Sequence, residues 1–149
     1  MRAYPAFVIN ESSDITAEPD LVRLEALLEE AELALVVAGS HFDARRRKAN
    51  HVLARAGDSG TVAELRSALR CVPDAQRWDF MMPGEPTVAL FAAGRRYLAA
   101  ITIVGSAHVR SLGLLEGDVL LAEPERLIHW LTVTTGSKSF GSDRATLAD

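Results

Sequence analysis

Residues 85–134 constrain the fold of this chain more than any other segment, because four short β-rich runs separated by glycine turns precede an amphipathic helix there. The four runs are Thr87–Ala92, Arg96–Val104, Ala107–Leu112 and Asp118–Ala122. Short connections favour an antiparallel meander over βαβ units, which need long crossovers. The run Tyr97–Val104 is apolar on both faces, so we place it in the centre of the sheet.

A helix is predicted to follow the meander from Pro124 to about Thr134. Proline is favoured at the first helical position, and Glu125 lies where the helix dipole favours negative charge. Leu127, Ile128 and Leu131 give this helix one apolar side.

The alternation of side chains before the meander predicts one more strand. Trp78, Phe80 and Met82 alternate with Arg77, Asp79 and Met81, the period of a half-buried strand. The sheet would then have about five strands. We expect both tryptophans, Trp78 and Trp130, to anchor the core where the sheet meets the helix.

Three helices are predicted in the N-terminal half of the chain. They cover Asp20–Ala38, Asp43–Ala56 and Thr61–Cys71. In each range, apolar residues recur at three- and four-residue steps and so form one apolar stripe. Short links between the helices favour a compact layer.

The fold predicted from these patterns is α+β, with an N-terminal three-helix layer, an antiparallel meander of about five strands and a C-terminal helix across the same sheet face. One domain covers residues 1–135, with the helical part at about 20–72 and the sheet plus helix at about 76–134. Residues 136–149 are expected to form a flexible tail. The residues expected in the core are Val88, Leu90, Leu98, Ile101, Ile103, Leu120, Leu127 and Leu131.

Composition predicts a soluble, cytoplasmic protein. The hydrophobic fraction of 48% and the charged fraction of 24% are typical of a globular domain. A single cysteine, Cys71, excludes an intramolecular disulfide and fits a reducing compartment. The N-terminus lacks the apolar segment of a secretory signal, and no apolar run approaches the roughly 20 residues that span a bilayer.

The segment from about Arg77 to Leu131 also carries a resemblance. Its runs "GEPTVALF", "HVR" and "GDVLLAEPERLIHWL" are similar to the C-terminal half of small uncharacterised proteins from high-GC Gram-positive bacteria. In those proteins a meander with a polar His/Arg turn precedes an acidic-Pro helix that ends in Trp-Leu. The resemblance covers about a third of the chain and implies the fold of this segment, but no activity.

Charge is segregated along the N-terminal half. Residues 11–32 hold eight acidic residues against one base, whereas residues 43–55 are basic through Arg45, Arg46, Arg47, Lys48 and Arg55. The basic cluster is a candidate surface for a protein partner or for nucleic-acid phosphates. Alternatively it is a solvated face screened by the acidic helix, where each exposed pair contributes about 0–1 kcal/mol.

Nucleic-acid binding is the weaker of these interpretations. The net charge of −4 argues against a dedicated nucleic-acid binder. A helix-turn-helix with Thr61–Arg66 as its recognition helix would place Glu64 against phosphates, and the helix before it is too long for the compact motif.

His108 and Arg110 lie two residues apart on one predicted strand and therefore share a face, with Asp118 in the strand that follows. A histidine, an arginine and a carboxylate on one face are a candidate site for a small anion or a carbonyl group. The alternative is an ion-paired outer face of the sheet. The four histidines lack the spacing of metal ligands, and no nucleophile or phosphate-binding glycine loop is recognisable, so no catalytic residue, metal or cofactor is predicted.

The function predicted is a small non-enzymatic protein-interaction or regulatory module, in the broad class of immunity proteins, antitoxins and accessory factors. Its partner would be another protein. A small-molecule site at His108 and Arg110 is the alternative, and nucleic-acid binding through Arg45–Lys48 is a second one. The edge of the strand Asp118–Ala122 needs a cover, for which the candidates are the N-terminal segment Ala3–Ile9, the C-terminal helix and a homodimer. Which partner or ligand is bound stays open.

Overall fold

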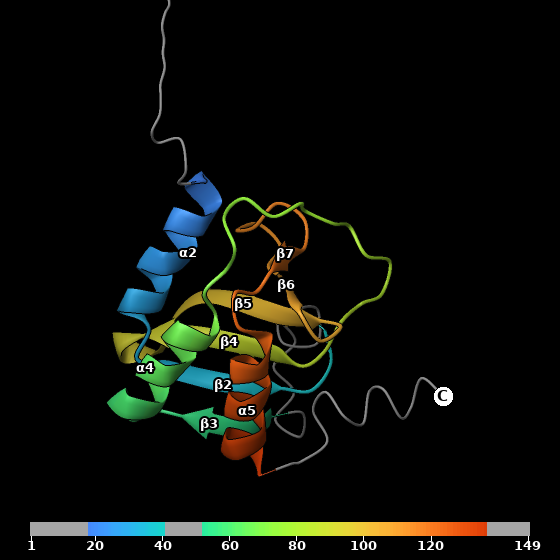
Figure 1. Ribbon diagram of the computed structural model, residues 1–149. Helices are drawn as coiled ribbons and strands as arrows, with labels where there is room; N and C mark the ends of the chain where they lie inside the picture. The colour runs from blue at the N-terminus through green and yellow to red at the C-terminus, as the bar shows by residue number, and fades with distance from the viewer. Residues whose placement is uncertain (1–17, 41–51, 137–149) are drawn as a thin grey trace, which may run out of the picture.

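The computed structural model of the protein describes residues 18–40 and 52–136, which form an α+β fold of three α-helices and a six-stranded sheet (Figure 1). The elements in chain order are α2 (Pro19–Glu30), β2 (Leu33–Val37), β3 (Val52–Ala56), α4 (Ser59–Ala68), β4 (Thr87–Ala92), the 3-10 turn η3 (Ala93–Arg95), β5 (Arg96–Val104), β6 (His108–Arg110), β7 (Val119–Leu120) and α5 (Pro124–Thr135).

The sheet is antiparallel throughout, with the strand order β3-β2-β4-β5-β6-β7. Strands β4 to β7 form the predicted meander. The hairpin of β2 and β3 extends the sheet beyond β4, because β2 pairs with both β3 and β4. The chain then passes from β3 through α4 to β4, and β2 lies between these two strands.

All three helices cover one face of the sheet, on the near side in Figure 1. Their buried residues, among them Leu28, Leu65 and Leu131, join one hydrophobic cluster with the inward residues of the strands. Trp130 is buried in this cluster, and its indole Nε1 donates to the Thr61 carbonyl at 2.9 Å. The indole thus ties α5 to the start of α4, which confirms Trp130 as a core anchor.

The opposite sheet face is apolar as well. Leu33, Ala89 and Phe91 form a second small cluster there, with Leu35 packed against it. All six residues of β4 are buried, so this strand is enclosed on both faces. The fully buried Thr87 hydroxyl donates to the Gly39 carbonyl at 3.0 Å and lies 2.8 Å from the fully buried Thr102 hydroxyl, so both groups have a hydrogen-bond partner.

The predictions for residues 87–134 are largely confirmed. Strands β4 and β5 have the predicted bounds, and α5 begins at Pro124. The predicted strands Ala107–Leu112 and Asp118–Ala122 are shorter, as β6 and β7. Of the eight predicted core residues only Leu98 and Leu120 are half-buried, and the others are buried.

The first predicted helix, Asp20–Ala38, is too long. Helix α2 ends at Glu30, Ala31 is extended, and Leu33–Val37 is strand β2. The run from Leu33 to Val37 buries four of its five residues, which a strand between two others achieves and a surface helix does not. Leu28, Ala31 and Leu35 fit a helical stripe by coincidence of spacing.

The second predicted helix, Asp43–Ala56, is wrong for its last five residues, which form strand β3. The remainder, 43–51, lies outside the described residues. The predicted three-helix layer is not matched, because the described residues 18–40 and 52–72 contribute two helices and two strands. The third helix agrees better, as α4, and Asp58 caps it by accepting from the Thr61 amide at 3.0 Å.

The strand predicted for Arg77–Met82 is also wrong. These residues form an irregular loop in which only Trp78 makes a β-bridge, with Asp118. Trp78 is 48% exposed and is not a core anchor. Trp78 and Met82, two of the apolar residues that alternate here, are exposed to solvent and not buried in a sheet.

The outer edge of β7 is covered by the chain that follows α4. The Val72 amide donates to the Leu120 carbonyl at 2.9 Å, and the Ala122 amide donates to the Arg70 carbonyl at 2.8 Å. This cover comes from residues 70–72 and not from the C-terminal helix, while the N-terminal candidate, Ala3–Ile9, lies outside the described residues. It removes the reason for expecting a dimer through this edge, while a homodimer as such stays a prediction.

Candidate functional site

Arg110 and Asp118, two of the three residues of the predicted anion site, form a bidentate ion pair. Arg110 lies at the end of β6, and Asp118 directly precedes β7. The Arg110 Nε donates to Asp118 Oδ1 at 2.7 Å, and Nη2 donates to Oδ2 at 2.9 Å. The Asp118 side chain is 1% exposed and that of Arg110 is 18% exposed. The hydrogen bonds to Asp118, and then its charge, raise the pKa of Arg110 against the effect of burial.

The remaining N–H groups of Arg110 hold a loop, residues 77–84, which we call the Trp-Met loop. Nη2 donates to the Phe80 carbonyl at 2.8 Å, and Nη1 donates to the carbonyls of Met82 at 2.8 Å and Pro83 at 3.3 Å. Asp118 Oδ2 accepts in turn from the Phe80 amide at 2.9 Å. A guanidinium has five N–H groups, and each has an acceptor here.

His108, the third residue of the predicted site, takes no part in this ion pair. Its ring meets Phe80 edge-on with 5.0 Å between ring centroids, and Phe80 stacks on Trp78 at 5.8 Å. The ring of Phe80 therefore contacts both the ring of Trp78 and that of His108. Such offset and edge-on contacts are favourable beyond the area they bury.

Arg77 fixes the other end of the Trp-Met loop. Its guanidinium makes ion pairs with Asp20 at 2.9 Å and with Glu18 at 2.6 Å, and it donates to the Glu116 carbonyl at 2.6 Å. The hydrogen bonds from Arg77 lower the pKa of Asp20 to about 2, against the opposing effect of its partial burial. The same hydrogen bonds raise the pKa of Arg77. Sequence reasoning missed this pair, because Asp20 lies far away along the chain and no local pattern marks it.

Two glycines let the backbone of the Trp-Met loop approach the sheet and the loop before β7. Gly84 has φ +78°, and a Cβ there would lie 2.7 Å from the Ile103 carbonyl oxygen. Gly117 has φ +73°, and a Cβ there would lie 2.9 Å from the Trp78 carbonyl oxygen. Only glycine tolerates both the left-handed conformation and this proximity.

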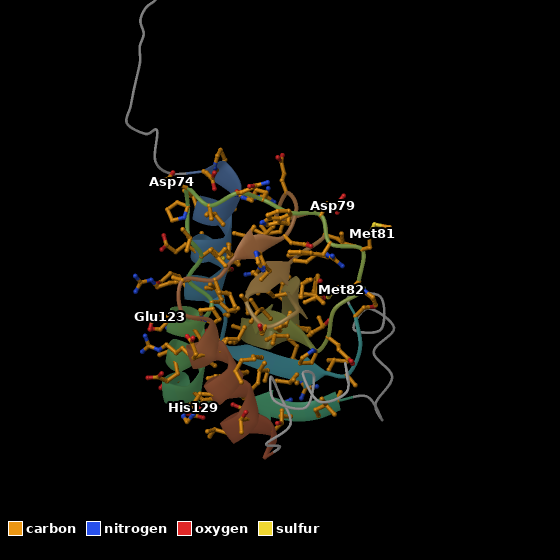
Figure 2. The ribbon with its side chains drawn as sticks, turned by 45° about the vertical axis from the view of Figure 1, so that its right-hand side comes forward. Asp74, Asp79, Met81, Met82, Glu123 and His129 are labelled. Atoms are coloured by element: carbon orange, nitrogen blue, oxygen red, sulfur yellow. The ribbon has the colours of Figure 1, made fainter. Side chains whose placement is uncertain are left out.

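The Trp-Met loop exposes large apolar side chains although its backbone is held firmly. Met81 is 98% exposed, Trp78 48% and Met82 47%. Figure 2 shows Asp79, Met81 and Met82 along one outer edge of the molecule, at the right of the view. No short-range sequence signal identifies this exposure, since the alternation of the same residues is that of a half-buried strand.

Two surface hollows lie elsewhere, and neither is lined by His108, Arg110 or Asp118. One of about 380 Å³ lies between α2 and α4, where burial raises the pKa of the Cys71 thiol to about 12. The other, of about 600 Å³, lies between the start of α2 and residues 113–116. An anion at Arg110 would have to displace a carbonyl of the Trp-Met loop.

The predicted basic surface is only partly described. Arg45, Arg46, Arg47 and Lys48 lie outside the described residues, and Arg55 is exposed on β3. Arg66 of α4 donates to the Leu28 carbonyl at 2.7 Å, so it caps the end of α2. The helix-turn-helix interpretation is wrong, because residues 52–56 form a strand where it needs a helix.

The Trp-Met loop is therefore the feature of the described residues that most clearly presents a surface to another molecule. Among those residues, no three histidine, cysteine, aspartate or glutamate side chains gather as metal ligands. None of the helices in residues 18–40 and 52–136 is long and apolar enough to cross a bilayer. Comparisons of the chain with family models, with curated proteins and with solved structures found no match.

Proposed function

We propose that the protein is a small, non-enzymatic, cytoplasmic protein-interaction module of the regulatory, immunity or accessory kind, and that the Trp-Met loop is its contact surface. The observation that carries the proposal is the exposure of Trp78, Met81 and Met82 on a loop whose backbone is braced by Arg110. Tryptophan and methionine are enriched in the cores of protein interfaces. Methionine adapts its shape to a partner because its side chain is unbranched and flexible.

The bracing matters because a loop that must become ordered on binding loses affinity to conformational entropy. Arg110 and Asp118 together engage the backbone of Phe80, Met82 and Pro83. Arg77 fixes the start of the loop to α2. The loop is thus ordered before any partner arrives, and only side-chain freedom remains to be lost.

The geometry favours this function over a small-anion site at His108 and Arg110. All five N–H groups of Arg110 already have acceptors in the protein. His108 lies edge-on against Phe80, and neither His108 nor Arg110 lines either of the two hollows. The polar groups of Arg110 and Asp118 form hydrogen bonds with the backbone of the loop rather than with solvent.

Site-specific photo-crosslinking tests the proposal. A photoreactive phenylalanine analogue would replace Met81, and in a control chain it would replace Val133, which is 66% exposed on α5. In host cells we expect position 81 to give one discrete adduct with another polypeptide and position 133 to give none. Absence of an adduct at position 81, or the same adducts at both positions, contradicts the proposal.

A further inference from the structure

The surroundings of the Trp-Met loop indicate the chemistry of its partner, an inference that rests on the proposed function. Asp79 lies within the loop and Glu85 directly follows it, and both are exposed. Neither forms an ion pair with a described residue. Within residues 73–86 the only basic residue is Arg77.

The two arginines near the loop compensate this negative charge only in part. Arg77 is neutralised by Asp20 and Glu18. Arg110 pairs with Asp118, and the charge of Asp79 raises the pKa of Arg110 further without forming an ion pair. The exposed surface therefore combines apolar tryptophan and methionine side chains with two carboxylates, Asp79 and Glu85, that form no ion pair with a described residue. Figure 2 shows Asp79 next to Met81 on the same outer edge.

We infer that the Trp-Met loop binds a basic, apolar peptide segment, in which lysine or arginine side chains flank an apolar anchor. The apolar anchor contacts Met81 and Met82. A cation of the segment lies over the exposed indole of Trp78, whose face attracts positive charge, and pairs with Asp79. Glu85 takes a second cation at the far end of the loop.

Charge complementarity selects this partner over polyanions. Unpaired carboxylates repel nucleic-acid phosphates and anionic lipid surfaces at close range. The same carboxylates accelerate association with a cationic segment, an effect that salt screens. The surface therefore discriminates between partners by sign of charge as well as by apolar contact.

Two synthetic peptides that share leucine positions and differ only in carrying lysine or glutamate between them test the inference. Each is titrated into the full chain labelled with ¹⁵N. We expect the lysine peptide to shift the amide signals of residues 77–85, with affinity falling when salt is raised from 0.05 to 0.5 M. The glutamate peptide should leave these signals unchanged.

Charge-reversal variants locate the effect. In Asp79→Lys/Glu85→Lys we expect the affinity for the lysine peptide to fall by about tenfold or more. The control Glu25→Lys/Glu29→Lys changes the net charge equally on α2, where both side chains are exposed, and should retain the affinity. If the first variant fails to fold, Asp79→Asn/Glu85→Gln replaces it and should show a smaller loss of the same kind.

Several outcomes overturn the inference. Equal binding of both peptides, equal loss in both charge-reversal variants, or loop shifts produced by single-stranded DNA or anionic vesicles would each do so. A crosslinked polypeptide at position 81 that binds Asp79→Lys/Glu85→Lys as tightly as the original chain also overturns it, but leaves the proposed function standing. Absence of any crosslink at position 81 removes the proposed function itself.

Discussion

Asp118 supports two parts of the molecule with one carboxylate, since it neutralises Arg110 and accepts from the Phe80 amide. Its carboxylate is almost fully buried and the Arg110 side chain is only 18% exposed, so water would replace a lost carboxylate incompletely. Breaking a buried ion pair by removing one partner leaves an uncompensated charge, which costs far more than an intact pair contributes.

Asp118→Ala should therefore lower the free energy of unfolding by about 3–5 kcal/mol, measured by urea denaturation. The control Glu30→Ala breaks the exposed ion pair between Glu30 and Arg96 and should cost about 0–1 kcal/mol. Equal losses in the two variants would show that the Arg110–Asp118 pair does not brace the fold.

Asp20 gives the protein a defined acid sensitivity. Its pKa is lowered from the usual 3.8 to about 2 by Arg77, so its charged form stabilises the folded state above about pH 4. This contribution is lost as the pH falls through the window from about 4 to about 2. Because the site is partly solvated, we expect roughly 1–2 kcal/mol rather than the full value of the shift.

Urea denaturation of Asp20→Asn at pH 7 and at pH 2.5 checks this expectation. The variant should be less stable than the original chain at pH 7, and the difference should shrink to about a third at pH 2.5, which lies between the unfolded and folded pKa values. Asp74→Asn, which changes an exposed carboxylate without an ion pair to a described residue, should show no such convergence. A difference at pH 2.5 as large as that at pH 7 would mean that the carboxylate charge is not what stabilises this site.

Sequence reasoning found the Arg110–Asp118 neighbourhood but not its role. The spacing of His108 and Arg110 on a strand, and the short link to Asp118, are local signals that a meander converts into proximity. The acceptors of Arg110 on the Trp-Met loop are not local, because Phe80 and Met82 lie about 30 residues earlier. Whether an arginine faces a ligand or a backbone loop depends on such distant contacts.

Among the elements, those with one dominant period were predicted well. Strands β4 and β5 are continuous apolar runs between glycine turns, and α5 has a proline start and a glycine end. The boundary between α2 and β2 was missed because the contacts that end the helix come from a distant part of the chain. Arg66 of α4 donates hydrogen bonds to the Leu28 and Ala31 carbonyls. Strand β3 was missed because a five-residue run fits either period.

Two glycines of the loop before β7, Gly113 and Gly117, allow a matched test of how the Trp-Met loop is held. Gly113 and Gly117 both have positive φ, but a Cβ at Gly113 meets nothing within 4 Å, whereas one at Gly117 would clash with the Trp78 carbonyl. Gly113→Ala should cost about 1 kcal/mol from the left-handed conformation alone. Gly117→Ala should cost about 1–3 kcal/mol more and should shift the amide signal of Trp78.

Urea denaturation and amide spectra of the two variants provide the measurement. Equal destabilisation would mean that the segment carrying Trp78 moves away from Gly117 at no cost. The Trp-Met loop would then not be held as closely as the structure indicates.

In the whole molecule, the residues that stabilise the fold are different from the residues that face outward. Leu65 of α4 is fully buried among helices and sheet, whereas Met81 has almost no contact with the rest of the chain. Leu65→Ala should lower the free energy of unfolding by about 2–5 kcal/mol. Met81→Ala should change it by no more than about 0.5 kcal/mol, while weakening the binding of the lysine peptide.

Thermal and urea unfolding of the two variants, with peptide titration of each at a temperature where both are folded, checks this separation. If Met81→Ala destabilises the chain as much as Leu65→Ala does, the methionine serves the core and not a partner.

The cover of the β7 edge by residues 70–78 has a consequence for digestion by proteases. Between Ala68 and Thr87 the chain has no helix and no regular strand, and such segments are the usual places of attack. Here the amides of Val72, Trp78 and Phe80 are bonded to β7 or to Asp118, so a protease cannot draw the segment into its cleft without dismantling one side of the sheet. Chymotrypsin should therefore cleave after Trp78 and Phe80 only at the rate at which this side of the sheet opens, and cleavage there reports that opening rather than the motion of a loop.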